Sequence, residues 1–441
     1  MKKYFGLLML LGLFYFNTKA QNKKNEVKSF SLSQAIEFAK QNNYSLKNNK
    51  LDVIASEKKV NEILALGLPQ INASGNFINN TTIATNFINF GGKITPLQFG
   101  QPFSSTASIT GTQLLFDGGF LMGVKAASEY VNLAKLNVNR GEIETEVNVT
   151  KAYYLALLLQ TNALLIDTNI LTMAKTKNDL EKTYANGLIE KTDFDRVTLQ
   201  YSSLLLQRER IYNSYKVALM VLELQLGINV SDSINLTDKL SELYQNTKAP
   251  SADSKSDYNK LPEYQILNQQ LRLQDLDRKR ILFGYAPSLS GVVSTQRNAF
   301  AGDFSSLGNT WYPGTYWGLN LNIPVFDGLR KNAQLQQSKI SISQTENNKK
   351  NLENAIDQKI SSTKMAFDLA NRQVKIQEDN LKLAQEIYDR VNIKYKNGVG
   401  SSLDLTNSQN DLANARQTYL STIYDYFSAQ IELRRAYGDI K

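Results

Sequence analysis

Two kinds of hydrophobic pattern alternate along the first half of this chain. Apolar side chains recur at helical spacing over residues 46–66, 120–186 and 192–226. Residues 70–79 and 104–116 instead alternate apolar and polar side chains with the period of two that is typical of a β-strand. The pattern therefore predicts a helix, two strands and then two long antiparallel helices.

Shorter signals complete this unit. A helix over residues 31–40 is expected ahead of the first long one, with Ser31 or Ser33 as its cap. Residues 80–102 are polar and contain glycine, so we expect a long loop between the two strands.

The same order of patterns returns in the second half. Helical spacing covers residues 264–282, 329–396 and 402–437, and strand-like alternation covers residues 287–295 and 316–326. The fold class is therefore expected to be mainly α with a small β part, built as a duplicated unit of long helices and four strands.

Short markers give the register of this duplication. Residues 115–119 (Leu-Phe-Asp-Gly-Gly) recur 210 positions later as Val-Phe-Asp-Gly-Leu. Residues 184–187 (Tyr-Ala-Asn-Gly) recur 211 positions later as Tyr-Lys-Asn-Gly, and Leu68-Pro69 returns 218 positions later as Ala286-Pro287. A unit repeated in this way must bury its edges against its own copies or against other chains.

The markers also suggest domain boundaries. We expect a first repeat over residues 21–227 and a second over residues 261–441. The polar residues 228–260 between them are predicted to be a linker with one short helix near Leu240.

The long helices carry a coiled-coil period. About 65 residues without a break predict a rod of about 100 Å. The returning helices place apolar or aromatic residues seven apart, at Val197, Leu204, Ile211 and Ala218 and again at Leu405, Leu412, Tyr419 and Tyr426.

Residues 1–20 have the features of a secretory signal peptide. Lys2 and Lys3 precede an apolar run over residues 5–16, and Thr18-Lys19-Ala20 suits cleavage before Gln21. A retained anchor is the alternative, but the run is shorter than the roughly 20 residues that span a membrane. No later apolar run approaches a transmembrane helix, which excludes a helical membrane protein and leaves a β-barrel open.

The composition argues against an enzyme. The chain has no His and no Cys, which excludes thiol catalysis, disulfides, Cys/His zinc sites and Ser-His chemistry, and we expect no cofactor and no metal. The net charge of +9 is spread among acids without a basic cluster, so no nucleic-acid partner is expected.

The strands have the length of tilted membrane strands, about 10 residues. Four strands are too few to close a barrel, and an open edge cannot face lipid, so three chains would have to share one barrel of 12 strands. Aromatic residues are predicted near the strand ends, as a membrane-interface belt requires: Phe77, Phe87, Phe90, Trp311, Tyr312, Tyr316 and Trp317. A soluble sandwich edge or a small β-cap on a coiled-coil stalk is the alternative.

Over about residues 30–439 the chain resembles the TolC-type outer-membrane efflux channels of Gram-negative bacteria. The resemblance rests on the duplicated halves, the Phe-Asp-Gly and Tyr-x-x-Gly turns, and the run Leu-Asp-Leu-x-x-Ser-Gln-x-x-Leu-x-x-Ala over residues 403–415. It implies a homotrimeric exit duct that crosses the outer membrane and extends into the periplasm as an α-helical tunnel. It also implies a periplasmic adaptor (membrane fusion) protein and an energised inner-membrane pump as partners.

The resemblance also implies where the narrow periplasmic end of the duct lies. The family's tip Tyr matches Tyr395, and its ring Asp matches Asp404, with Asp193 as a second Asp in the first repeat. The family's second ring acid is Asn407 here, and its Arg in the second turn falls at Gly400, so an uncharged constriction is plausible. Capping boxes at Ser401–Asp404 and Thr192–Asp195 would explain the acids as helix caps instead.

Two further sites belong to the turns themselves. Gly187, Leu188, Gly398 and Val399 lie at the turns between long helices, where the resemblance implies adaptor docking and where a left-handed glycine cap is the simpler explanation. A trimeric surface stalk without transport remains the alternative function, whereas a passive porin would need more strands and no long helices.

Overall fold

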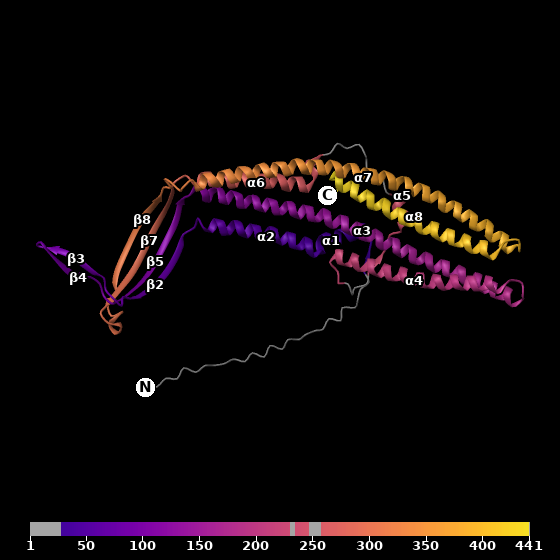
Figure 1. Cartoon of the computed structure of the whole chain (residues 1–441), viewed down its shortest axis with the longest axis horizontal. Helices are drawn as coiled ribbons and strands as arrows, with labels where there is room; N and C mark the ends of the chain where they lie inside the picture. Colours follow the sequence, from indigo (N-terminus) through magenta and orange to yellow (C-terminus); the bar gives the residue numbers. More distant parts are fainter. Residues whose placement is uncertain (1–27, 230–233, 247–256, 441) are drawn as a thin grey trace, which may run out of the picture.

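The computed structural model describes residues 28–229, 234–246 and 257–440. The chain is elongated, with a β-sheet at one end and long helices over the rest (Figure 1). The expected signal peptide, residues 1–20, lies outside the described residues.

The first half follows the predicted order of elements. Its long helices begin and end within a few residues of the predicted bounds. The elements are β1 (Lys28–Phe30), α1 (Leu32–Asn42), α2 (Tyr44–Ala65), β2 (Gln70–Asn79), β3 (Thr85–Phe90), β4 (Lys93–Gln98), β5 (Phe103–Phe116), α3 (Gly118–Ala185) and α4 (Lys191–Leu226).

The second half repeats this order without a counterpart of the β3–β4 hairpin. Its elements are α6 (Pro262–Phe283), β7 (Ser288–Ala301), η2 (Phe304–Ser306), β8 (Tyr312–Asn322), α7 (Arg330–Lys396) and α8 (Ser402–Tyr437). Between the halves, the described part of residues 228–260 holds β6 (Ile234–Leu236), α5 (Leu240–Asn246) and η1 (Tyr258–Lys260), so the predicted helix near Leu240 is confirmed.

The first helix begins as the sequence predicts. Ser31 is the N-cap of α1, its hydroxyl accepts a hydrogen bond from the Gln34 backbone N–H, and the Gln34 side chain accepts one from the Ser31 backbone N–H. This reciprocal capping box satisfies two backbone donors at the start of the helix.

Two loop predictions were wrong. Residues 80–102 contain the β3–β4 hairpin, which turns at Gly91 and Gly92, a glycine pair typical of tight hairpins. The strands of the second half were expected over residues 287–295 and 316–326 with a loop between them, but β7 runs to Ala301 and β8 begins at Tyr312 and ends at Asn322. Pairing explains the longer strand, because β5 supplies backbone partners to β7 as far as Phe103 opposite Ala301.

The main sheet has the order β2-β5-β7-β8 and is antiparallel throughout. A representative row across it is Ile71, Gly111, Val293 and Trp317. The edge strands β2 and β8 have no outer partner in the described chain. Because β2 and β8 are the two edges and do not pair with each other, the sheet is an open four-stranded ribbon.

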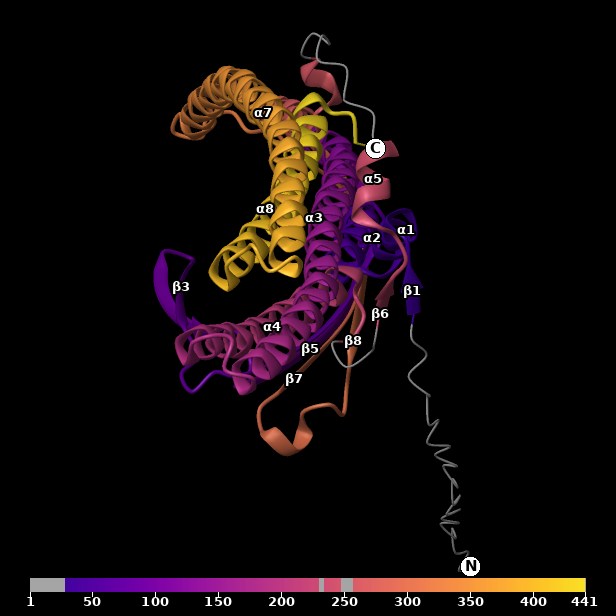
Figure 2. The same ribbon diagram turned by 90° about the vertical axis from the view of Figure 1, so that its right-hand side faces the viewer.

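The helices form two hairpins. Figure 1 shows α3 with α4, and α7 with α8, running to the end of the molecule opposite the sheet. Between each hairpin and the sheet, α2 lies along α3 and α6 lies along α7. Viewed from the helical end, the helices follow an arc rather than a compact bundle (Figure 2).

The main core lies where the short helices meet both hairpins. Tyr153, Leu222, Ile423, Phe427 and Leu433 are fully buried there. The rings of Tyr154 and Phe427 stack with centroids 4.2 Å apart, which joins α3 of the first repeat to α8 of the second.

One described helix, α3, is long and apolar enough to cross a membrane by length and composition alone, contrary to the sequence expectation. A core helix of a soluble protein meets the same criterion. Val149, Tyr153 and Leu157 of α3 are buried in the main core. Only 28% of the most apolar stretch of the helix is buried within the chain, so contacts inside the chain account for part of its apolar character.

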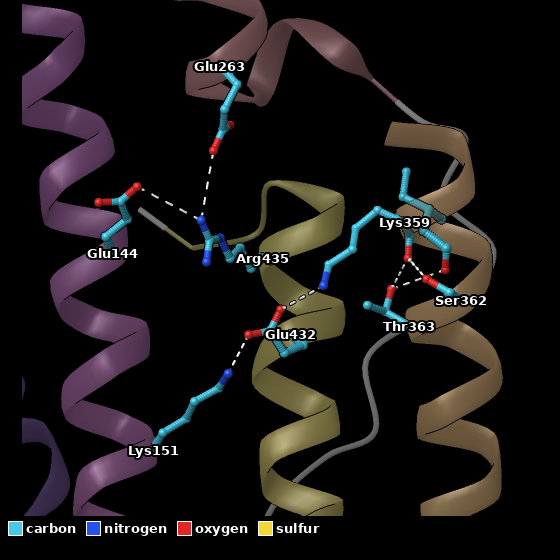
Figure 3. A network of polar contacts seen from close by, with 9 residues as sticks. Glu144, Lys151, Glu263, Lys359, Ser362, Thr363, Glu432 and Arg435 are labelled. Carbon is cyan, nitrogen blue, oxygen red and sulfur yellow. Dashed lines mark hydrogen bonds and ion pairs between the residues drawn. The ribbon is translucent and has the colours of Figure 1, made fainter. Parts of the chain in front are cut away.

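A network of ion pairs links three long helices near the core (Figure 3). Glu432 of α8 accepts a hydrogen bond from Lys151 of α3 and lies 3.3 Å from Lys359 Nζ of α7. Arg435, one turn on, lies 4.0 Å from Glu144 and 3.9 Å from Glu263. The sequence shows no sign of this network, because its members are far apart in the chain.

The network makes stability depend on pH. Burial would raise the pKa of Glu432, but the hydrogen bond and charge of Lys151, together with Lys359, outweigh burial and lower it. A lowered carboxyl pKa gives stability that is present above the ordinary glutamate value of 4.5 and is lost as pH falls through the folded value.

Glu432→Gln should therefore lower stability at neutral pH by about 1–3 kcal/mol, because two lysines lose a charged acceptor. It should also reduce the loss of stability between neutral and acid pH. Urea unfolding followed by circular dichroism at several pH values measures both effects. Glu346→Gln, which removes an exposed acid from α7, is the control. Equal pH dependence in Glu432→Gln and the native chain would contradict the assignment.

Candidate functional site

The sheet separates polar from apolar side chains. On one face hydroxyl and amide groups bond across strands: Ser74 to Ser108 at 2.8 Å and Thr110 to Ser294 at 2.9 Å between hydroxyl oxygens. Thr106 donates from its hydroxyl to Asn298 Oδ1 at 2.9 Å on the same face. The sequence alternation predicted polar faces, but only the register shows that they align into one surface across all the strands.

The opposite face is mainly apolar and exposed, with the hydroxyl pair of Thr295 and Thr315 among its side chains. Ile71, Ile109, Val293, Trp317 and Leu319 share it, and Ile71 and Trp317 are 75% and 80% exposed. A face of this kind on an open ribbon is typical of a surface that another apolar phase covers. Polar on one side and apolar on the other is the pattern of a transmembrane barrel strand.

The aromatic belt predicted from the sequence is only partly present. Phe77 lies at the far end of the sheet, where its ring meets Phe103 and Phe304 at centroid distances of 6.3 and 5.9 Å. Tyr316 and Trp317 lie near the middle of β8 and not at its end. Phe87 and Phe90 belong to the separate β3–β4 hairpin. The prediction failed because it assumed that the last strand begins at residue 316. Pairing with β7 starts β8 at Tyr312, so Tyr316 and Trp317 fall inside the strand.

At the other end of the molecule the two helical turns have the same backbone. Gly187 and Gly398 have φ of 72° and 74°, a left-handed conformation that favours glycine. In each turn the glycine N–H donates to a tyrosine carbonyl, that of Tyr184 or Tyr395. The N–H of the following residue, Leu188 or Val399, donates to the carbonyl of the residue before that tyrosine. These are Schellman caps, which end both helices in the same direction.

The residues after the two glycines are exposed. Leu188 is 74% and Val399 78% exposed, and both turns lie at the end of the molecule opposite the sheet (Figure 1). Two apolar side chains are thus presented outward from one end of the protein.

Tyr395 joins the two hairpins. It packs against a buried cluster of the first hairpin, Met173, Leu180 and Val197, although it belongs to α7. Burial raises the pKa of Tyr395, and the negative charges of Asp179 and Asp193 raise it further. The structure thus brings together Tyr395 and Asp193, two of the residues singled out in the sequence.

The other two candidates point to solvent. Asp404 and Asn407 are exposed on the first turns of α8. Ser401 caps this helix by accepting a hydrogen bond from the Leu403 N–H at 3.1 Å, whereas Asp404 has no hydrogen bond or ion pair among the described residues. The predicted capping box is therefore incomplete, and the Asp404 carboxylate is left facing water.

The second predicted capping box, Thr192–Asp195, was wrong. The N-cap of α4 is Glu190, without a side-chain cap, and the Thr192 hydroxyl lies 3.2 Å from Glu190 Oε2. Helix α4 begins two residues earlier than the box assumed, so Thr192 is already inside the first turn.

Gly400 has a steric reason to be glycine. A Cβ at this position would lie 2.7 Å from the Tyr395 backbone nitrogen and 3.0 Å from the Lys394 carbonyl carbon. A larger residue would have to move the last turn of α7. This close approach explains why the position that is Arg in the resembled family holds no side chain here.

Comparisons with known proteins agree with this geometry. Residues 284–439 match the model of a family described as outer membrane efflux protein. The outer membrane protein TolC of Salmonella enteritidis is 23% identical over 466 residues, covering 100% of this chain and 87% of the relative. The outer membrane efflux protein BepC of Brucella suis is 24% identical over 415 residues, covering 93% and 86%.

A solved structure of CusC, which forms a transmembrane channel, has the same fold. The TM-score is 0.73 with 18% identity, and the match covers 92% of this chain and 91% of CusC.

Tyr395→Ala should loosen the contact between the two hairpins. Removing a half-buried aromatic ring should cost about 1–2 kcal/mol locally, less than the roughly 3–5 kcal/mol of a fully buried one. Hydrogen exchange should then quicken at Met173, Leu180 and Val197, in the hairpin that was not mutated. Tyr395→Phe keeps the ring and should exchange like the native chain. Unchanged exchange in Tyr395→Ala would show that Tyr395 does not join the hairpins.

Proposed function

We propose that this chain is a TolC-type outer membrane efflux protein and that three copies form one exit duct for exported substrates. The protein is an outer-membrane efflux channel that extends into the periplasm. The duct itself is passive. The energy comes from an inner-membrane pump, which the duct meets through a periplasmic adaptor protein.

The observation that carries this proposal is the open sheet. Its four strands leave one edge on β2 and one on β8, and its apolar face is exposed. Each unsatisfied backbone group costs several kcal/mol in lipid, so an open edge is unstable there. Three copies joined from β8 to β2 close a barrel of 12 strands with the apolar faces toward lipid and the polar faces toward the lumen.

The helices continue the duct below the membrane. The 68 residues of α3 correspond to about 100 Å of helix, and α7 is nearly as long. Two repeats, over residues 21–227 and 261–441, each supply half of one copy's share of the wall. An arc of helices, rather than a bundle with a filled centre, suits a hollow tube and disfavours the stalk alternative.

The narrow end lies at the helical tip. We assign the periplasmic gate to Asp404, Tyr395, Asp193 and Asn407, with Asp404 as the free charge. Tyr395 and Asp193 hold the two hairpins together, which is supported by their proximity in one copy. Gly187, Leu188, Gly398 and Val399 form the docking tips, and the exposure of Leu188 and Val399 supports an apolar contact with the adaptor.

The mature protein should be a trimer in mild detergent. Its mass should be close to three times that of the chain, which is 49.6 kDa before removal of the signal peptide. Light scattering or native mass spectrometry measures this. A stable monomer that retains its strand signal in circular dichroism would exclude the shared barrel.

Asp404→Asn should weaken the cation preference of the open or leaking channel in planar bilayers. Three carboxylates in a narrow ring concentrate cations, and Asn407 adds no second charged ring. Asp368→Asn is the matched control, since it removes one exposed acid from α7 about 40 Å from the tip.

A different result is expected if Asp404 serves only the helix dipole. The substitution would then cost about 0.3–1 kcal/mol of local stability and leave the reversal potential in a salt gradient unchanged.

A further inference from the structure

The β3–β4 hairpin distinguishes the first repeat from the second. It extends the connection from β2 to β5, whereas β7 and β8 are joined through the short η2. Its two strands pair with each other and form a sheet apart from the main one. A two-stranded hairpin on its own is marginally stable in water, so we expect further contacts to hold it in place.

The base of the hairpin is fixed to the end of the main sheet. The Asn80 backbone N–H donates to the Pro102 carbonyl at 2.7 Å, directly after the last residue pair of β2 and β5. The Asn80 side-chain Nδ2 donates to the Gln101 carbonyl at 3.3 Å. Further along, Gln98 Nε2 donates to Thr85 Oγ1 at 3.2 Å and joins the first residue pair of the hairpin. The hairpin therefore leaves the sheet in a defined direction.

Both faces of the hairpin carry exposed apolar side chains. The pairing places Phe87 and Ile94 on one face, where they are 72% and 67% exposed. Ile88 and Leu97 lie on the other face and are also exposed. The hairpin thus offers apolar surface in two opposite directions.

This distribution disfavours lipid as the partner of the hairpin. A hairpin lying on a membrane would cover one apolar face and leave the other in water. A hairpin crossing the membrane would expose the unpaired backbone groups of both its strands to hydrocarbon. A partner on each side, as in a ring of hairpins from several copies, covers both faces.

The hairpin also lies where such a ring can form. Figure 1 shows it at the end of the molecule beyond the main sheet, opposite the helical tip. Seen along the molecule, it lies on the concave side of the helical arc (Figure 2). Three copies that turn their concave sides to a common axis would direct three hairpins over the outer mouth of the duct.

The hairpin is long enough to reach that axis. A barrel of 12 strands that are about 4.8 Å apart and tilted by about 40° is about 25 Å across. Six residue pairs make a hairpin about 20 Å long. Because this length exceeds the radius of the barrel, the tips of three hairpins can meet over its opening.

The tip of the hairpin carries an isolated positive charge. Lys93 follows the turn at Gly91 and Gly92 and is the only charged residue over residues 63–116. Its side chain is exposed and has no hydrogen bond or ion pair among the described residues. Ring closure would bring three such ammonium groups to one narrow opening, where charge of a single sign concentrates counter-ions.

We propose that the β3–β4 hairpins of three copies pack on one another over the outer mouth of the barrel and that Lys93 lines the opening that they leave. The apolar side chains hold the hairpins together, and the lysines keep the opening wet and favourable to anions. The proposal rests on the trimeric duct proposed above. It gives the duct opposite charges at its two ends, with Asp404 at the inner end and Lys93 at the outer end, so that the outer opening disfavours the entry of cations from outside.

A single cysteine tests the packing, since the native chain has none. Ile94→Cys places a thiol near each tip, so mild oxidation or a short bis-maleimide should link two chains of one trimer. A non-reducing gel would show a chain dimer in a fraction that does not change on dilution in detergent. Asn309→Cys is the control, because it exposes a thiol in the loop between η2 and β8, at the same end of the molecule, and it should remain unlinked.

The contrary result is equally clear. A native trimer in which Ile94→Cys links no more than Asn309→Cys would overturn the ring of hairpins. Quenching of a fluorophore on Ile94→Cys by brominated lipid would place the hairpin on the membrane instead and would also overturn it.

Ion selectivity tests the role of Lys93. In the Asp404→Asn background, which lacks the inner charge, Lys93→Gln should lower the preference for chloride over potassium at least about threefold. The reversal potential in a salt gradient across a planar bilayer measures this. Arg297→Gln is the matched control, because Arg297 is exposed on the face of β7 that carries Val293 and is expected to lie outside the lumen. Equal reversal potentials in the two variants would overturn the assignment of Lys93.

The outcomes separate this proposal from the proposed function. A native chain that is monomeric removes the duct and the ring of hairpins together. A native trimer with unlinked hairpins leaves the duct in place and overturns only its outer constriction.

Discussion

Unpaired backbone at the edges of the sheet is the constraint on which the rest of this structure depends. A four-stranded ribbon with one apolar face cannot be stable in lipid while β2 and β8 have free donors and acceptors. Closing the sheet into a barrel requires other copies of the chain. Only in a closed barrel does the polar face line an interior. The membrane part therefore gains its inside and outside only on assembly, although each strand already carries both faces in its alternation.

The helical part solves a related problem with side chains. Each long helix has one face for its hairpin partner and one for the next repeat, so a single chain satisfies only some of these faces. Within one chain the two repeats meet through a buried apolar core, in which Tyr154 stacks on Phe427, and through ion pairs such as the Glu432 network. Faces without a partner in the chain carry exposed apolar side chains such as Leu51 and Ile340.

Much of the fold could be predicted from the sequence because its helices are long and uninterrupted. Periodicity, glycine turns and the repeated markers together located the long helices, the main strands and both tips. The β3–β4 hairpin was missed because residues 80–102 lack strict alternation, and the ends of β7 and β8 depend on pairing with distant strands. At the tip, the proximity of Tyr395 to Asp193 and the contact of Gly400 with Tyr395 depend on tertiary packing, which no local pattern contains.

The equal lengths of the helices limit how this protein can change during evolution. Helices α4 and α8 have 36 residues each, and α3 and α7 have 68 and 67. A ring built from such hairpins has a level rim, whatever docks on it. An insertion in one helix alone would tilt a single turn out of that plane and shift every heptad beyond it. Lengthening the tube therefore requires matched insertions in all four helices, in multiples of a heptad, so loops and not rods are where related sequences can differ in length.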